Sequence, residues 1–248
     1  MRRFYSEEIS GEEISGADSR VELTGGEFAH LKKVLRLIVG DEVAVFDGKG
    51  HEVVGTIETI GKSSATVRVT AATLNKGEDE KKIILLQGLL KSDKPELVIQ
   101  KATELGVNEI IFYSSERTVA LVAREKGAAR IARWRKTAIE AAKQCGRTVI
   151  PKISILSLDE ALTAGQGLLR IIIWENEQRS TLKSAIKGSS NATGVAVVIG
   201  PEGGLTKEEV TKAKAAGYAS ASLGKLILRA ETAAIAAIAM LRFFFSEA

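Results

Sequence analysis

The sequence has one cysteine, two histidines and no hydrophobic run long enough to cross a membrane. A single cysteine excludes an internal disulfide and favours a reducing compartment, which we expect to be the cytoplasm. No Cys/His spacing resembles a zinc site, so we expect no metal ion. Arg2 and Arg3 give the start of the chain the cations of a signal peptide, but no apolar stretch follows them, so no signal peptide is predicted. The apolar run from Ala233 to Leu241 is too short for a bilayer and predicts a buried helix.

The net charge of the chain is small. The 35 Lys and Arg residues against 31 Asp and Glu residues leave a net charge of +4. This excess permits a polyanionic partner without requiring one, so the position of the cations matters more than their number. A chain of 248 residues is long enough to bury a real core in one large domain or two modest ones.

The first part of the chain alternates polar and apolar residues between glycine-rich turns, from about residue 21 to residue 72. This pattern predicts short antiparallel strands, at residues 42–46, 52–60 and 65–69, that close into a small barrel. One helix interrupts them. Thr24 and Glu27 have the spacing of a capping box, and the apolar stripe that follows contains Phe28, Leu31, Val34 and Leu35.

Cations of this helix lie largely off the apolar stripe, at Lys32, Lys33 and Arg36. One interpretation is a solvated helix face. The other joins them with Arg2 and Arg3 in a surface that contacts RNA phosphates.

A charged, glycine-containing break at residues 75–82 separates two patterns. We predict two domains there, of residues 1–74 and 75–248. In the second, strands alternate with helices, which is typical of a parallel sheet covered on both faces. Strands are predicted at residues 83–89, 110–113, 153–156, 169–174, 195–199 and 220–223. Helices are predicted to start at Asp93, with Glu96 completing a capping box, to span residues 127–145 and 181–186, and to start at Thr206 and near Glu231.

The tight turn Gly-Pro-Glu-Gly-Gly at residues 200–204 leaves the carboxyl end of the buried strand 195–199. Ligands of open α/β sheets bind at such ends. The turn lacks the Lys-Ser/Thr of a phosphate-binding P-loop and the spacing of G-x-G-x-x-G. Glycine turns after strands are common in any case, so a purely structural role stays open. A second unusual stretch, residues 222–233, places apolar residues 226–228 beside Gly224, an arrangement that can pack a flat heterocycle.

These two stretches, IGPEGG at 199–204 and LGKLILRAETA at 223–233, resemble the signature pair of the RsmE family. That family comprises 16S ribosomal RNA uridine-N3 methyltransferases of the SPOUT class. Further matches are HLKKVLR at 30–36, KATELGV at 101–107 and EAAKQCGR at 140–147, so the resemblance runs nearly end to end. It implies a PUA-like β-barrel RNA-binding domain and then a SPOUT domain, an α/β domain with a parallel sheet and a trefoil knot. The knot would hold S-adenosyl-L-methionine.

The resemblance also implies site residues. The expected cofactor contacts are Gly200, Glu202, Gly203, Leu223, Gly224, Ile227 and Leu228. Arg229 and Glu231 are the expected catalytic residues: Arg229 near the uracil carbonyl oxygens, where negative charge develops, and Glu231 or Glu202 orienting it or accepting the proton. The alternative for this pair is an ion pair at the start of the last helix. Leu226 departs from the basic residue that many relatives have there.

Other titratable residues support weaker hypotheses. Lys91, Lys94, Arg117 and Arg147 lie near strand or helix ends where RNA phosphate can be met, although each is also explained as surface charge. Cys145 is on an apolar helix stripe and is predicted to be a buried core thiol, not a nucleophile. His30 and His51 receive no catalytic role.

Three functions remain to be separated. The leading one is methylation of a uridine in 16S ribosomal RNA or the small ribosomal subunit. The alternatives are a non-catalytic RNA-binding or ribosome-assembly protein, and a nucleotide-using enzyme with residues 200–204 as a phosphate nest. The last helix, apolar on all sides, predicts a homodimer, unless the N-terminal barrel covers it.

Overall fold

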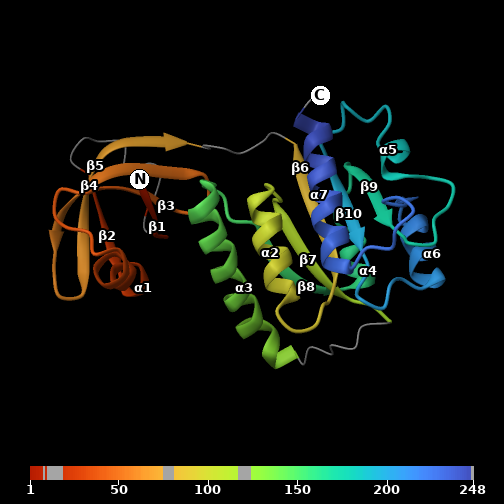
Figure 1. Cartoon of the computed structure of the whole chain (residues 1–248), viewed down its shortest axis with the longest axis horizontal. Helices are drawn as coiled ribbons and strands as arrows, with labels where there is room; N and C mark the ends of the chain where they lie inside the picture. The colour runs from red at the N-terminus through yellow and green to blue at the C-terminus, as the bar shows by residue number, and fades with distance from the viewer. Residues whose placement is uncertain (8, 10–18, 75–80, 117–123, 247–248) are drawn as a thin grey trace. The chain divides into compact units, whose positions relative to one another are not determined.

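The computed structural model describes the whole chain except residues 8, 10–18, 75–80, 117–123 and 247–248 (Figure 1). The chain forms two compact units. The first comprises Met1–Glu78 and Ile139–Ile150, and the second comprises Asp79–Ala138 and Pro151–Ala248. The units differ from the predicted domains, 1–74 and 75–248, in that residues 139–150 belong with the first. The predicted break itself falls mostly on residues outside the described part.

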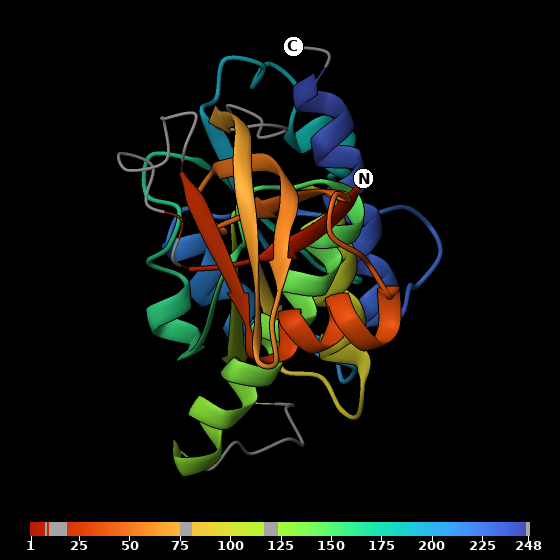
Figure 2. The same cartoon turned by 90° about the vertical axis from the view of Figure 1, so that its left-hand side faces the viewer.

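The first unit is built on a mixed five-stranded sheet (Figure 2). Its strands are β1 (Arg2–Tyr5), β2 (Arg20–Thr24), β3 (Glu42–Phe46), β4 (His51–Ile60) and β5 (Ser64–Leu74), in the order β1-β3-β4-β5-β2. The alternation predicted from sequence is present, since Val21 and Leu23 are buried while Glu22 is exposed. The strands pair antiparallel as expected, with one exception among the described residues. The exception is β1, which runs parallel to β3, and β1 and β2 are the sheet edges.

The helix of this unit also differs from its prediction. It consists of α1 (Gly25–Ala29) and a π-helical turn, η1 (His30–Leu35), which ends at Arg36 with a left-handed φ of 53°. Thr24 is the N-cap residue but its side chain makes no capping hydrogen bond. The Glu27 carboxylate instead accepts one from Lys143 Nζ, at 3.0 Å. Because a π-turn is wider than an α-turn, Val34 leaves the predicted apolar stripe and is 66% exposed.

The second unit contains a six-stranded sheet in which all neighbours are parallel. Its order is β11-β9-β10-β6-β7-β8. The strands are β6 (Lys82–Gly88), β7 (Glu109–Ser114), β8 (Lys152–Ser157), β9 (Leu169–Ile173), β10 (Gly194–Ile199) and β11 (Ala219–Ala221). Every residue of β10 is buried, as its uninterrupted apolar run predicts for a strand covered on both faces.

Helices cover both faces of this sheet, which confirms the prediction. They are α2 (Lys94–Glu104), α3 (Arg124–Cys145), α4 (Leu158–Ala161), α5 (Leu182–Ala185), α6 (Lys207–Ala215) and α7 (Ala230–Ser246). One cluster packs Leu158 of α4 and Val210 of α6 against Leu86 and Val198 of the sheet. Elsewhere α7 contacts β6 and β10 and lies beside α2 (Figure 1), and α3 places Trp134 against Phe112.

The predicted capping boxes have different outcomes. Thr206 and Glu209 form theirs, with reciprocal hydrogen bonds of 3.1 and 2.9 Å at the start of α6. Asp93 is the N-cap of α2, yet its side chain makes no capping bond, and Glu96 forms an ion pair with Arg133. The carboxylate therefore pairs with a cation on a neighbouring helix instead of closing its own helix start.

Cys145 is exposed, so the prediction of a buried core thiol is wrong. The apolar stripe does bury Trp134, Ala138 and Ala141. Cys145, however, is the last residue of α3, where the chain turns away at Gly146 with a φ of 88°. Within the described residues, no helix is long and apolar enough to span a membrane.

Candidate functional site

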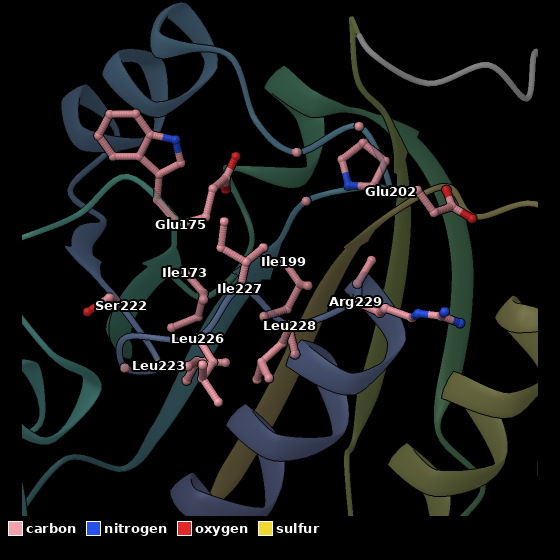
Figure 3. Close-up of a pocket in the computed structure, with 18 of the residues that line it drawn as sticks. Ile173, Glu175, Ile199, Glu202, Ser222, Leu223, Leu226, Ile227, Leu228 and Arg229 are labelled. Carbon is pink, nitrogen blue, oxygen red and sulfur yellow. The ribbon is translucent and has the colours of Figure 1, made fainter.

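A cavity of about 420 Å³ lies in the second unit at the carboxyl ends of β9, β10 and β11 (Figure 3). Parallel strands bring these ends to one edge of a sheet, which is where open α/β folds bind ligands. Three loops supply most of its walls, with Lys94 of α2 and the start of α7. The lining residues are Ile173 to Glu175, Ile199 to Gly204, Ser222 to Arg229, Ala230 and Ala233.

Buried hydrogen bonds hold the end of β10. The hydroxyl of Tyr113 donates to the carbonyl of Ile199 at 2.9 Å, and the amide of Gln87 donates to the carbonyl of Gly200 at 3.1 Å. Burial, together with the charge of Glu209, raises the pKa of Tyr113 well above its ordinary value, so its hydroxyl stays a donor. The adjacent Gly88 must be glycine, because an added Cβ would lie 2.4 Å from the nitrogen of Pro201.

The turn after β10 is closed by a hydrogen bond from the amide of Gly204 to the carbonyl of Pro201, at 3.0 Å. Gly204 has a φ of 72°, which favours glycine. A Cβ added there would lie 2.4 Å from Oε1 of Glu175, which belongs to the loop after β9. Backbone conformation and space thus both require glycine at this wall of the cavity.

The end of β11 lies between the two ends of the segment that follows β9. The amide of Trp174 donates to the carbonyl of Ala221, and the amide of Ser222 donates to the carbonyl of Ser180, both at 2.9 Å. The loop then passes Gly224, with a φ of 127°. It carries Leu226 and Ile227, whose exposed fractions are 81% and 82%. Figure 3 shows these side chains around the cavity with Ile173 and Ile199. This exposed apolar surface is suited to cover a flat ring.

The opposite rim of the cavity is charged. Nζ of Lys94 lies 3.3 Å from Oε1 of Glu202 and 3.5 Å from Oε2 of Glu231. Glu231 is 9% exposed, and its Oε2 has no hydrogen-bond partner in the described part of the chain. Arg229 is exposed and lines the cavity, and Figure 3 shows it on the same side as Glu202.

Glu202 is held as a carboxylate. Partial burial raises the pKa of this group. Hydrogen bonds from the backbone amides of Lys91, at 3.0 Å, and of Glu202 itself lower the pKa, as does the Lys94 ammonium, and together they outweigh burial. The pKa is lowered below its ordinary value.

All seven expected cofactor contacts line this one cavity, as does Arg229, while Glu231 is linked to it through Lys94. The residues expected from the sequence did not include Trp174 and Glu175, which line the cavity in the loop after β9. They included Lys94 only as a phosphate contact. Trp174 and Glu175 directly follow a buried strand, and Lys94 lies in the first turn of a helix. These positions were the sequence signals that could have predicted a place in the site. These assignments remain proposals.

The cations expected to contact RNA fall into different environments. In the first unit Arg2, Lys32, Lys33 and Arg36 are exposed, and Lys32 donates to the carbonyl of Gly61 at 2.9 Å. Arg3 is largely buried. Its Nε donates to Glu52 at 2.8 Å and its Nη1 to the carbonyl of Ala142 at 2.7 Å.

Arg147, also of the first unit, is 4% exposed. In the second unit Lys91 is exposed, whereas Lys94 is engaged with the two carboxylates. Arg117 lies outside the described residues. Burial makes Arg3 and Arg147 the weakest candidates for phosphate contact.

Comparisons with known proteins match both units. A family model described as an RNA methyltransferase domain matches residues 77–242, and one described as an RNA methyltransferase PUA domain matches residues 23–70. The chain is similar to "Ribosomal RNA small subunit methyltransferase E" of Rickettsia conorii, with 34% identity over 93% of this chain and 92% of that protein. The protein of the same name from Bacillus subtilis is 28% identical over 98% of this chain and 96% of its own length.

Two solved structures are also similar. The Neisseria gonorrhoeae ribosomal RNA small subunit methyltransferase E, bound to S-adenosyl methionine, has a TM-score of 0.88 at 30% identity and covers 99% of this chain and 98% of its own. A Legionella pneumophila protein, described as a putative methyltransferase in complex with the same cofactor, has a TM-score of 0.86 at 30% identity over 97% and 96% of the two chains.

Proposed function

Because the chain belongs to the RNA methyltransferase family that includes the ribosomal RNA small subunit methyltransferase E proteins, we propose that it methylates N3 of a uridine in 16S ribosomal RNA. The methyl donor is S-adenosylmethionine. The observation that carries this proposal is the cavity at the ends of β9, β10 and β11, because the residues expected from the sequence motifs converge there. Two similar proteins hold this cofactor in their solved structures.

The residues of the cavity fit such a cofactor. Gly200, Gly203 and Gly204 bring backbone close to a ligand, and Leu226, Ile227 and Leu228 offer apolar surface to an adenine ring. When bound, the cofactor supplies an electrophilic methyl group on a sulfonium. The chain must then align the uracil with that methyl group and stabilise its deprotonated form.

The charged rim supplies what this reaction requires from side chains. Uracil N3 gives its proton to a carboxylate, for which Glu231 is the candidate, since its ion pair with Lys94 places it beside the cavity. The negative charge left on the uracil spreads over two carbonyl oxygens, and the exposed Arg229 is the cation to stabilise it. The N3–methyl bond forms as the methyl–sulfur bond breaks, leaving S-adenosylhomocysteine. Alkyl transfer of this kind requires no metal ion.

Lys94 has a positioning role in this proposal. It joins Glu202, in the turn that surrounds the cofactor, to Glu231, the candidate base. A lysine held between two carboxylates has less freedom to reach phosphate. We therefore place it in the reaction site and not among the RNA contacts.

The trefoil knot expected of the SPOUT class is part of the proposal. It is supported by the hydrogen bonds of Ala221 and Ser222 to both ends of the segment 174–180. The homodimer is proposed on α7, where Met240 and Phe243 are 47% and 64% exposed although the opposite side is buried. We propose that the protein works in the cytoplasm on ribosomal RNA or the small subunit.

Calorimetry with S-adenosylhomocysteine and with ATP tests the cofactor directly. Binding of S-adenosylhomocysteine alone is expected. Binding of ATP alone would support the phosphate-nest enzyme, and binding of neither would support a non-catalytic RNA-binding protein. The similarity to proteins bound to S-adenosylmethionine favours neither alternative.

A further inference from the structure

The first unit exposes aliphatic side chains at the end of its π-helical turn. Val34, Ile38 and Val39 are 66%, 67% and 58% exposed, while their neighbours Leu35 and Leu37 pack against the core. Six consecutive residues span at most about 20 Å, so the three side chains are confined to a small region. Isolated exposed aliphatic residues are ordinary, but three in six residues are unusual.

The segment that carries them is held in a fixed conformation. Arg36 adopts a left-handed φ of 53°, and its backbone amide donates to the carbonyl of Leu31. Oδ2 of Asp41 accepts from the amide of Ile38 at 2.8 Å, and the amide of Gly40 donates to the carbonyl of Ile57 at 2.9 Å. A π-turn and a left-handed non-glycine residue both cost free energy and occur preferentially at functional sites. The exposure of Ile38 and Val39 is therefore built into the backbone.

Charge identifies the partner. Lys32, Lys33 and Arg36 are exposed in the same segment, which lies within the residues matched by the RNA methyltransferase PUA domain. Residues 32–39 contain no acidic residue, and Asp41 just beyond them accepts a hydrogen bond from the amide of Ile38. A positive surface suits phosphates, while aliphatic side chains among the cations add nothing to phosphate binding. They do suit the faces of unstacked bases, against which apolar side chains are inserted in other nucleic-acid complexes.

We propose that residues 32–39 form an RNA-docking surface in which Val34, Ile38 and Val39 pack against unpaired bases while Lys33 and Arg36 contact the flanking phosphates. The surface rests on the proposed function and deepens it, because it selects single-stranded or bulged RNA near the target over a continuous duplex. Lys32, which already donates to Gly61, has the smaller share of the phosphate contact.

The test compares an Ile38→Ser, Val39→Ser double variant with an Ile38→Leu, Val39→Ile control in the full chain. The probes are a 16S ribosomal RNA transcript and a blunt RNA duplex, each titrated at several salt concentrations. The serine variant is expected to bind the transcript about tenfold more weakly, because it loses the burial of part of one aliphatic side chain. The affinity of the control should stay within twofold of the parent. Because the lost contacts of the serine variant are apolar, its log-log salt slope stays unchanged, whereas Lys33→Ala flattens the slope by about 0.7 unit, as expected for one phosphate contact to a single strand.

Other outcomes overturn the proposal. Unchanged affinity of the serine variant for the transcript would remove the aliphatic contact, and an equal loss on the duplex would remove the preference for unpaired bases. If only binding to purified small ribosomal subunits falls, the surface meets a protein. S-adenosylhomocysteine binding, measured on the same variants, separates these outcomes from a failure of the proposed methyl transfer.

Discussion

The ammonium of Lys94 lies 3.3 Å from Oε1 of Glu202 and so links the first turn of α2 to the turn after β10. The same nitrogen lies 3.5 Å from the buried Glu231. One cation thus pairs with a carboxylate in the turn after β10 and with one in the first turn of α7. Removing the cation leaves both carboxylates without compensation and lets the turn and the helix start shift.

We predict that Lys94→Met lowers the single-turnover rate of methyl transfer on the order of tenfold or more. Misplaced reacting groups raise the activation free energy, and an increase of about 1.4 kcal/mol slows the reaction tenfold. RNA affinity and its salt slope should stay unchanged. The matched control is Lys91→Met, since Lys91 holds Glu202 through its backbone amide, which the substitution keeps. Weaker RNA binding with a flatter salt slope and a normal rate would contradict this role and show that Lys94 contacts RNA phosphate instead.

The second prediction concerns Gly204. Gly204→Ala should weaken S-adenosylhomocysteine binding about tenfold, because the new Cβ meets Glu175 and narrows the cavity. It should also destabilise the fold by roughly 1–2 kcal/mol through its left-handed backbone. Gly188→Ala is the control. Gly188 has a similar φ of 80°, but no atom lies within 4 Å of its added Cβ. Equal loss of ligand affinity in both variants would mean that strain alone, and not occupied space, is responsible.

The third prediction is a pH dependence of stability. The pKa of Glu202 is lowered in the folded protein from an ordinary value of 4.5, so its carboxylate stabilises the fold above that pH. This contribution is lost as the pH falls through the folded-state pKa. Urea unfolding should therefore show Glu202→Gln to be less stable than the parent at pH 7, with the difference shrinking below about pH 4.5. A difference that grows on acidification would contradict the assignment.

A fourth prediction tests the homodimer. Phe243→Glu, on the exposed side of α7, should convert the dimer to a monomer in light scattering at micromolar concentration, because a charge cannot be buried there unpaired. Thr211→Glu, at an exposed position of α6, should leave the mass unchanged. A parent protein that is monomeric and active would eliminate the interface altogether.

Periodicity predicted most of the second unit because its strands are continuous apolar runs between helix signals. The strand 195–199 and the capping box of Thr206 and Glu209 are confirmed for that reason. The capping boxes predicted at Thr24 and Asp93 are wrong because their glutamates form ion pairs elsewhere. Glu27 pairs with Lys143 and Glu96 pairs with Arg133, and sequence spacing does not reveal such partners.

Other features depended on long-range packing that local pattern does not contain. β1 is an edge strand of four residues whose parallel partner, β3, lies about 40 residues away. Four residues are too few to show the alternation that predicts a strand. The π-turn that exposes Val34 has no known sequence mark in this chain. Within the candidate site, the motifs predicted which residues converge, but the link from Lys94 to Glu202 and Glu231 required the tertiary structure.

The central claim, methylation of a 16S ribosomal uridine at N3, is tested most directly by mass-spectrometric nucleoside mapping of ribosomal RNA from cells with and without this chain. N3-methyluridine should disappear from one position of 16S RNA without the chain, and the parent sequence should restore it while an Arg229→Met variant does not. Unchanged N3-methyluridine in cells that lack the chain would contradict the proposed activity.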